Sequence, residues 1–245
     1  MTAHSIVYAP IGQATRSEQV IERLTNAIIA GLLEPKEQLP NETELSRLMG
    51  VSPMTVREAL NTLRIRRLID TRRGRNGGSF VCEMSSEERQ KHHPLRLATA
   101  HYLADLGEFH CAVVGHSARL AAQRSTPTEI RRLTQQIDAF AAAVQPEARA
   151  QADMRCLLML AANAQSARLA NQELEIQGEW APLSAGLYQD ATIHAEIVAI
   201  YRLLETALHE ADDLVSCQLA QSMIAVLTDR MLEDKLRIDV ESQAR

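Results

Sequence analysis

Apolar residues recur at helical spacing near the start of the chain. One face of a helix over residues 17–30 would carry four of them: Val20, Leu24, Ala27 and Ile28. Ser17 can cap the start of this segment, and Gly31 can end it. The pattern therefore predicts an amphipathic helix over residues 17–30.

Start and stop signals predict two more short helices. Asn41 and Glu44 form a capping-box-like pair in front of a second helix, which would end at Gly50. Ser52 can cap a third helix with Pro53 at its first position, where proline is tolerated. We expect that third helix to end near residue 66 or 67.

A β-hairpin is predicted after the third helix. Two short β-prone segments, 68–71 and 79–82, enclose a run rich in arginine and glycine. Glycine and asparagine in this run suit a turn that needs positive φ. Residues 32–39 are predicted to form a loop, because Pro35 and Pro40 interrupt any regular pattern there.

The remainder of the chain has a helical pattern after a polar linker. Residues 83–93 lack periodicity, and we interpret them as the linker. Expected helices include a long one over 94–123, one that begins at Thr126 with a capping box, and one that opens at Gln145. Gly178, Pro182 and Gly186 are expected to interrupt the pattern around Trp180. The last two helices are expected over 190–210 and 212–237.

These segments predict a mainly α protein with two domains. The expected divisions are a flexible N-terminus, a small domain, a linker, a helical domain and a tail: 1–16, 17–82, 83–93, 94–238 and 239–245. Aromatic residues make up only 3% of the chain and apolar residues 46%, which favours packed helices over a β-sandwich.

Composition also bears on the location of the protein. No apolar run of 18 residues occurs, and residues 1–15 lack the features of a signal peptide. We therefore expect a soluble cytoplasmic protein. Its four cysteines are too far apart for a zinc ribbon or a CxxC motif, and we expect most to be buried thiols. They are Cys82, Cys111, Cys156 and Cys217.

Charge is distributed unevenly along the chain. The net charge is −5, but residues 43–80 contain eight arginines and three acidic residues. From Lys91 onward there are 14 basic and 20 acidic residues. A basic segment on an acidic body is typical of a DNA-binding domain. A solvated helix face explains the charge alone equally well.

The second and third helices, joined at 50–52, form a helix-turn-helix pattern. In such motifs the N-terminal residues of the second helix meet base edges in the major groove. Those residues here are Ser52, Met54, Thr55 and Arg57. A guanidinium can bond bidentately to guanine or to phosphate, so Arg57 is the strongest candidate.

The motifs from Ser17 to Val81 resemble the winged-helix domain of the GntR family. They run in order: Gly31-Leu32-Leu33-Glu34-Pro35, Gln38-Leu39-Pro40-Asn41-Glu42, Gly50-Val51-Ser52, Thr55-Val56-Arg57-Glu58-Ala59-Leu60 and Gly77-Gly78-Ser79-Phe80-Val81. The resemblance implies a transcription regulator that binds double-stranded operator DNA. The hairpin would then be the wing.

The candidate DNA-binding residues lie in the two short helices and the wing. They are Asn41, Glu42, Arg47, Ser52, Met54, Thr55, Arg57, Arg72, Arg73, Arg75 and Gly77. Lys36 departs from the glycine usual in the family, while Thr43 and Pro53 replace arginines that contact DNA in some members. A winged helix used only for protein contacts is the alternative for this domain. Three further arginines fit either a solvated helix end or phosphate contacts: Arg64, Arg66 and Arg67.

The helical domain is similar to the effector-binding domain of the FadR-like branch of this family. The similar motifs are 118–124, 128–130, Asp153, and His194 with Ile197. The resemblance implies an antiparallel bundle of six or seven helices around a small-molecule cavity. It also implies a homodimer and a repressor that responds to an organic acid.

Many members of that branch hold a divalent metal through one aspartate and three histidines. Asp153 and His194 are the candidate metal ligands, but Leu157 occupies the position one turn after the aspartate. The chain is apolar near Val226, where the last histidine is expected, and His209 is the only other histidine in the last two helices. We therefore predict a metal-free or repurposed cavity and no certain cofactor.

Six residues are candidates for binding an anionic effector: His110, His116, Arg119, Asp153, Arg155 and His194. The histidines could instead lie on the surface, and the arginines could pair with neighbouring acids. Two other functions stay open, a ligand-blind dimeric regulator and a metal-dependent helical enzyme with a DNA-binding domain. No Ser-His-Asp order, phosphate-binding glycine loop or HExxH motif supports an enzyme.

Overall fold

The protein forms two compact units, Thr2–Pro94 and Leu95–Arg245. The structure, a computed structural model, describes residues 16–29, 32–72, 74, 77–84 and 94–243. The predicted flexible N-terminus, apart from Arg16, and most of the predicted linker lie outside the described residues.

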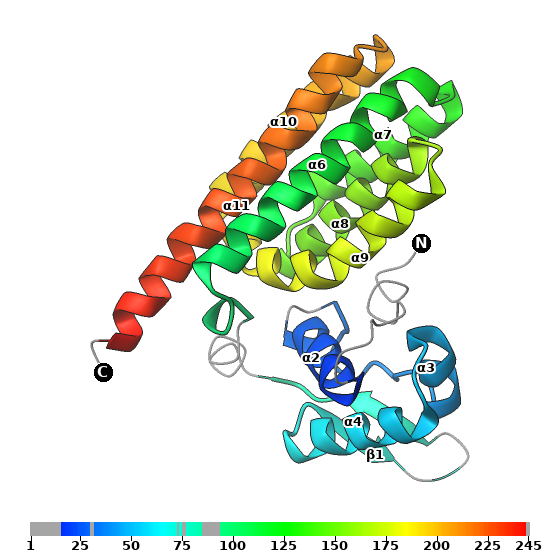
Figure 1. The fold of residues 1–245 in the computed structure, drawn as a ribbon, viewed down its shortest axis with the longest axis vertical. Coiled ribbons are helices and arrows are strands. Elements are labelled where there is room, and N and C mark those ends of the chain that lie inside the picture. The colour runs from blue at the N-terminus through cyan, green and yellow to red at the C-terminus, as the bar shows by residue number, and fades with distance from the viewer. Residues whose placement is uncertain (1–15, 30–31, 73, 75–76, 85–93, 244–245) are drawn as a thin grey trace. The chain divides into compact units, whose positions relative to one another are not determined.

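The first unit contains the three predicted helices, α2 (Arg16–Ile29), α3 (Glu42–Met49) and α4 (Pro53–Ile65) (Figure 1). The four apolar residues that predicted the first helix are all buried. The predicted cap at Ser17 was wrong, because this residue lies inside α2. Local signals therefore placed the helices well, and their burial comes from packing of α2 and α3 against α4.

Side-chain caps fix the turn between α3 and α4. The Asn41 side chain accepts a hydrogen bond from the backbone N–H of Glu44 at 2.9 Å, and Ser52 accepts one from Thr55 at 3.1 Å. Gly50 adopts φ 66° at the end of α3, a conformation that glycine reaches without strain. The sequence signals predicted all three features.

The predicted hairpin is confirmed as the antiparallel pair β1 (Ile69–Arg72) and β2 (Gly78–Val81). Each strand is shifted by one residue from its predicted segment. The loop before α3 also pairs with the hairpin, because Gln38 forms a bridge with Phe80. Lys36 in that loop has φ 69°, which explains why glycine suits this position.

Six α-helices form the described part of the second unit, together with two short 3-10 helices (Figure 1). They are η1 (Pro94–Arg96), α6 (Ala100–Arg124), α7 (Pro127–Ala142), α8 (Pro146–Asn163), α9 (Ala167–Ser184), η2 (Ala185–Gln189), α10 (Ala191–His209) and α11 (Asp213–Gln243). The longer helices lie side by side as a bundle, as predicted. Its core combines aliphatic residues with Phe140, Trp180, Tyr188 and Tyr201, which are all fully buried.

Three predicted helix boundaries were wrong. The long helix begins at Ala100 and not at residue 94, because Thr99 caps it by accepting from the N–H of Tyr102 at 3.1 Å. Helix α9 continues through Gly178 and Pro182, since its buried face is continuous to Ser184. Helix α11 extends to Gln243.

Helices α6 and α11 make the most extensive helix contact in the protein. Two glycines of α6 allow this approach. A Cβ atom on Gly107 would overlap the side chain of Thr228, and one on Gly115 would lie 2.6 Å from Cγ of Gln221. Small residues at both positions let the two backbones pack closely.

Two further predictions have clear outcomes. Helix α7 begins with the predicted capping box, in which Thr126 and Glu129 exchange hydrogen bonds. We expected most cysteines to be buried, and this was wrong, because only Cys156 is buried and the other three are partly exposed.

Within the described ranges, no helix is both long and apolar enough to cross a membrane.

Candidate functional site

The N-terminal end of α4 is exposed. Ser52, Pro53 and Met54 all face solvent, and Met54 is 60% exposed. Apolar residues later in the helix anchor its other face in the core. The predicted base-reading residues therefore lie at the exposed N-terminal end of a helix that is anchored in the core by its other face. A helix that enters the major groove needs such an accessible end.

Glu42 holds the guanidinium of Arg57 on this surface. The Nε and Nη2 atoms of Arg57 donate to Oε2 of Glu42 at 3.0 and 2.8 Å. This hydrogen bond raises the pKa of Arg57, which stays positively charged. We predicted Glu42 as a DNA contact, and the structure places it as the residue that orients Arg57.

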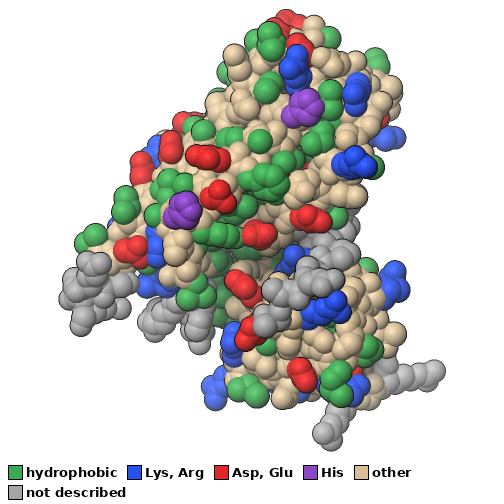
Figure 2. Space-filling model, viewed as in Figure 1, with side chains coloured by type: hydrophobic (Ala, Val, Ile, Leu, Met, Phe, Trp, Pro, Cys, Tyr) green, Lys and Arg blue, Asp and Glu red, His purple; other side chains and the backbone are tan. Residues whose placement is uncertain are grey.

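The other candidates on α3 lie beside this pair. Asn41 caps α3, and Arg47 is exposed six residues further along, nearly two helical turns. A shallow surface hollow is lined by Asn41, Glu42, Thr43, Glu44 and Arg47. Figure 2 shows both signs of charge on the visible face of the unit that contains α3 and α4.

The hairpin places one predicted arginine firmly. The guanidinium of Arg72 lies 4.5 Å from the ring centre of Phe80, a cation–π contact. A Cβ on Gly77 would lie 2.5 Å from the carbonyl oxygen of Arg72, so glycine is needed there. Arg73 and Arg75 lie outside the described residues.

The three arginines near the end of α4, which are Arg64, Arg66 and Arg67, differ in their contacts. Arg64 donates from Nε to Oγ1 of Thr71 at 2.9 Å and from Nη1 to Oδ1 of Asn61 at 3.2 Å. It therefore links α4 to the hairpin. Arg66 and Arg67 are exposed at the helix end.

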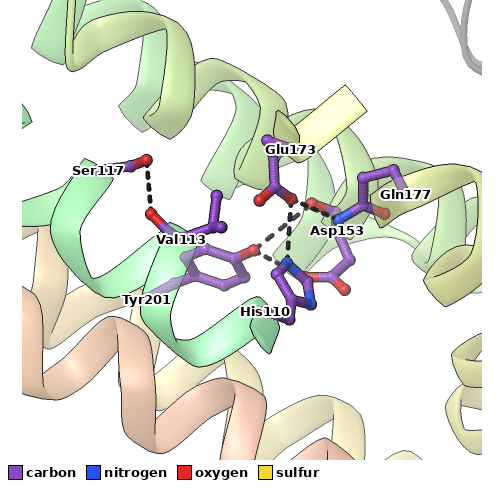
Figure 3. A network of polar contacts seen from close by, with 7 residues as sticks. All are labelled: His110, Val113, Ser117, Asp153, Glu173, Gln177 and Tyr201. Carbon is purple, nitrogen blue, oxygen red and sulfur yellow. Dashed lines mark hydrogen bonds and ion pairs between the residues drawn. The ribbon is translucent and has the colours of Figure 1, made fainter. Parts of the chain in front are cut away.

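The second unit encloses a group of polar side chains in its core, which we call the polar core cluster. Figure 3 shows its members His110, Asp153, Glu173, Gln177 and Tyr201. Its members come from α6, α8, α9, η2 and α10 and are all buried. They are His110, Asp153, Glu173, Gln177, Trp180, Tyr188 and Tyr201.

Glu173 lies at the centre of one half of this cluster. Its Oε1 lies 3.0 Å from Nε2 of His110 and accepts from Nε2 of Gln177 at 2.8 Å. The His110 ring also packs edge-on against Trp180, with ring centres 4.6 Å apart. Both His110 and Glu173 have side chains that are 0% exposed.

Asp153 lies at the centre of the other half. The hydroxyl of Tyr201 donates to its Oδ1 at 2.6 Å. Burial raises the pKa of Asp153 to about 6, because the hydrogen bond from Tyr201 offsets the loss of solvation only in part. This carboxyl group therefore changes its charge near neutral pH.

Five polar atoms of the cluster are buried without a hydrogen-bond partner. They are His110 Nδ1, Glu173 Oε2, Gln177 Oε1, Trp180 Nε1 and the hydroxyl of Tyr188. The Tyr188 hydroxyl is near enough to Asp153 to lower the pKa of that carboxyl, yet it lacks hydrogen-bond geometry. Each unpaired buried polar atom costs about 1–3 kcal/mol, so an ordered water or a bound small molecule would stabilise this cluster by pairing with these atoms.

The structure brings only two of the six predicted effector residues, His110 and Asp153, into this cluster. His116 is exposed, and Arg119 is exposed and bonds to Asp213 at 3.0 Å. Arg155 is also exposed. These three side chains lie outside the core because they occupy the solvent faces of α6 and α8.

His194 is buried but has a structural contact. Its Nε2 lies 2.8 Å from the carbonyl oxygen of Phe140, and its ring packs edge-on against the Phe140 ring. The residue of α10 that meets Asp153 is Tyr201. The predicted pairing of Asp153 with His194 was therefore misplaced by two helical turns.

These residues do not fit a divalent metal. Leu157, one turn after Asp153, is fully buried and apolar. Over the part of the chain that the structure describes, no three His, Cys, Asp or Glu side chains are grouped so as to hold a metal ion. A stable site needs about three protein ligands, and Asp153 has a tyrosine in their place.

Five members of the cluster were not predicted from the sequence: Glu173, Gln177, Trp180, Tyr188 and Tyr201. A signal for part of the set exists in the sequence. Glu173, Gln177 and Trp180 recur at i, i+4 and i+7, which places them on one helix face. We overlooked it because Gly178 and Pro182 were interpreted as interruptions.

Two family descriptions match the chain. The one for "Bacterial regulatory proteins, gntR family" matches residues 16–81, and the one for the FCD domain matches residues 105–225. These ranges correspond to the two units and together cover most of the chain.

Individual relatives agree with the family matches. RmpR of Mycobacterium gastri, named an HTH-type transcriptional regulator, is 38% identical over 81% of this chain and 75% of its own length. The Glc operon transcriptional activator of Escherichia coli is 32% identical over 46% of this chain and 44% of its own length. The solved structure of E. coli McbR/YncC shares the fold, with a TM-score of 0.51 and 17% identity, over 92% of this chain and 99% of that chain.

Proposed function

The chain belongs to the gntR family of bacterial regulatory proteins, DNA-binding transcription regulators with a helical effector-binding domain, and we propose that it acts as a homodimer on a palindromic operator and responds to a small molecule. The molecule would bind in the polar core cluster. The exposed end of α4 supports the first part, and the five unpaired buried atoms support the second.

In this proposal α4 enters the major groove and Arg57 contacts a guanine or a phosphate. Glu42 restricts the Arg57 guanidinium while DNA is absent, which lowers the entropy lost on binding. Arg72 and Gly77 place the wing against the neighbouring backbone. In a dimer, the two winged-helix domains would bind half-sites that lie about one turn of the DNA helix, roughly 34 Å, apart.

The ligand would act by favouring one arrangement of the helical bundle. Only a difference in affinity between two arrangements can change DNA binding. The polar core cluster draws residues from five elements, so a molecule bound there contacts most of the bundle at once. The family resemblance predicts an organic acid and repression, and both stay predictions.

The first test is selection of genomic DNA fragments by the purified protein, followed by sequencing. We expect enrichment of a short palindrome near a few promoters, and the Arg57→Ala protein should lose that enrichment. Sedimentation with and without the selected DNA tests the assembly. A monomer at micromolar concentration in both samples would contradict the dimer.

A ligand-blind regulator is the competing function. It would bind the selected operator with one affinity and show one melting temperature across a metabolite panel. A true effector at 100 times its dissociation constant should stabilise the protein by about 2.7 kcal/mol, which a melting experiment detects.

A further inference from the structure

The unpaired atoms of the polar core cluster are mainly hydrogen-bond acceptors. Glu173 Oε2 and Gln177 Oε1 are acceptors, because the Gln177 amide nitrogen already donates to the other Glu173 oxygen. His110 Nε2 faces the same carboxylate oxygen and therefore carries a proton, which leaves Nδ1 of the neutral ring as an acceptor. Trp180 Nε1 is the unpaired atom that can only donate.

The charged groups of the cluster also disfavour an anionic ligand. It contains two carboxyl groups, Asp153 and Glu173, and one imidazole. Among the described residues, the only buried Lys or Arg is Lys235, which bonds to Asp239 and to the Arg96 carbonyl. With its single proton on Nε2, the neutral His110 ring adds no positive charge to the cluster.

A carboxylate ligand would therefore be buried beside two acidic groups. The half-buried Arg149 does not relieve this, because its guanidinium donates to the carbonyls of Ala143 and Tyr188. An unpaired buried anion costs several kcal/mol, whereas N–H or O–H donors would satisfy the acceptors already present.

On the premise of the proposed function, we propose that the polar core cluster binds a small amine or polyol, a donor-rich molecule without a carboxylate. Its N–H or O–H groups donate to Glu173 Oε2, Gln177 Oε1 and His110 Nδ1. In a polyol, a hydroxyl oxygen also accepts from Trp180 Nε1. The proposal replaces the predicted organic acid with a ligand of opposite hydrogen-bonding character.

Trp180 provides a direct measurement, because it is the single tryptophan of the chain and belongs to the cluster. Full-length protein would be titrated with amines, polyols and carboxylates of matched size. The three- to six-carbon panel would include 1,4-diaminobutane, 1,4-butanediol and succinate. We expect amines or polyols to change Trp180 fluorescence, raise the melting temperature and alter affinity for the selected operator.

Matched variants locate the binding. Glu173→Gln removes one charge at nearly constant shape and should weaken the responding compound about tenfold or more. Glu175→Gln, on the exposed face of the same helix, is the control and should leave affinity within about twofold. If Glu173→Gln fails to fold, Trp180→Phe removes the indole donor and is read by calorimetry.

The outcomes separate this inference from the proposed function. Binding of carboxylates alone, lost in Glu173→Gln, would overturn the ligand class and keep the ligand-responsive regulator. Intact operator binding with no response to amines, polyols or carboxylates would overturn both the ligand class and the ligand-responsive regulator. Binding that survives Glu173→Gln and Trp180→Phe unchanged would place the ligand elsewhere and overturn the inference.

Discussion

Each of the two units contains an acid–base pair with a similar separation between its atoms, but one pair is exposed to solvent and the other is buried. Arg57 and Glu42 lie 2.8 Å apart on the surface, with side chains 63% and 40% exposed. His110 and Glu173 lie 3.0 Å apart and are both 0% exposed. Water can replace either partner of the first pair, so Arg57 can exchange Glu42 for DNA at little cost. Water cannot reach the second pair, so its unused hydrogen-bonding atoms need a specific partner.

This contrast predicts separable effects of substitution. Changes in the polar core cluster should alter folding stability and ligand response together. Changes at the exposed end of α4 should alter DNA affinity and leave stability almost unchanged.

The largest expected effect concerns Asp153 and pH. Its folded pKa of about 6 lies above the ordinary value of 3.8, so the folded state binds the proton more tightly than the unfolded state. Its stabilising contribution is complete at about pH 3, well below the unfolded pKa, and is lost as pH rises through the folded pKa of about 6, a total change of about 3 kcal/mol. Asp153→Asn lacks this titration, so the unfolding free energy of the variant, relative to that of the wild type, should rise by about 3 kcal/mol from pH 3 to pH 8.

Denaturant unfolding at a series of pH values measures this difference. Asp105→Asn, on the exposed face of α6, is the control and should track the wild type closely. A flat difference between Asp153→Asn and wild type would show that Asp153 is more solvated than its burial implies.

The second prediction tests the exposed pair. Arg57→Ala should weaken operator binding by about 2 kcal/mol, roughly 30-fold, if the guanidinium reads a base. Its melting temperature should stay near that of the wild type, because exposed ion pairs contribute only about 0–1 kcal/mol to stability. Fluorescence anisotropy with labelled operator and thermal unfolding measure the two quantities.

Arg168→Ala, at an exposed position of α9, is the matched control for charge. It should leave operator affinity unchanged. Equal losses in both variants would reduce the role of Arg57 to general electrostatics.

The smallest expected effect lies in the loop beside the hairpin. Lys36 adopts φ 69°, and an L-residue in this region costs about 1 kcal/mol. Lys36→Gly should therefore stabilise the protein by about 0.5 kcal/mol, after loss of the exposed pair with Glu83. Lys36→Ala loses the same pair but keeps Cβ, and it should not stabilise. Urea unfolding of the three proteins tests this order.

The sequence predicted the first unit more fully than the second because its features are local. Asn41, Gly50 and Ser52 act on backbone groups within a few residues, so spacing alone reveals them. The same holds for the capping box at Thr126. The exposed position of Arg57 followed from the same helix boundaries.

The polar core cluster depends on contacts between distant segments. Glu173 and His110 are 63 positions apart, and Tyr201 and Asp153 are 48 apart. No helical period indicates which buried acid will meet which hydroxyl or imidazole, because helix packing decides it. Histidine and arginine, chosen for their charge, drew attention to His116 and Arg119 on the surface.

The close packing of α6 against α11 has a mechanical consequence. His110 lies on α6 between Gly107 and Gly115, where Thr228 and Gln221 of α11 pack directly on its backbone. With no side chain at either glycine to act as a flexible spacer, a shift of α6 at this contact would disturb its packing against α11. A ligand that displaced the imidazole would therefore act on both helices, and α6 alone is about 37 Å long.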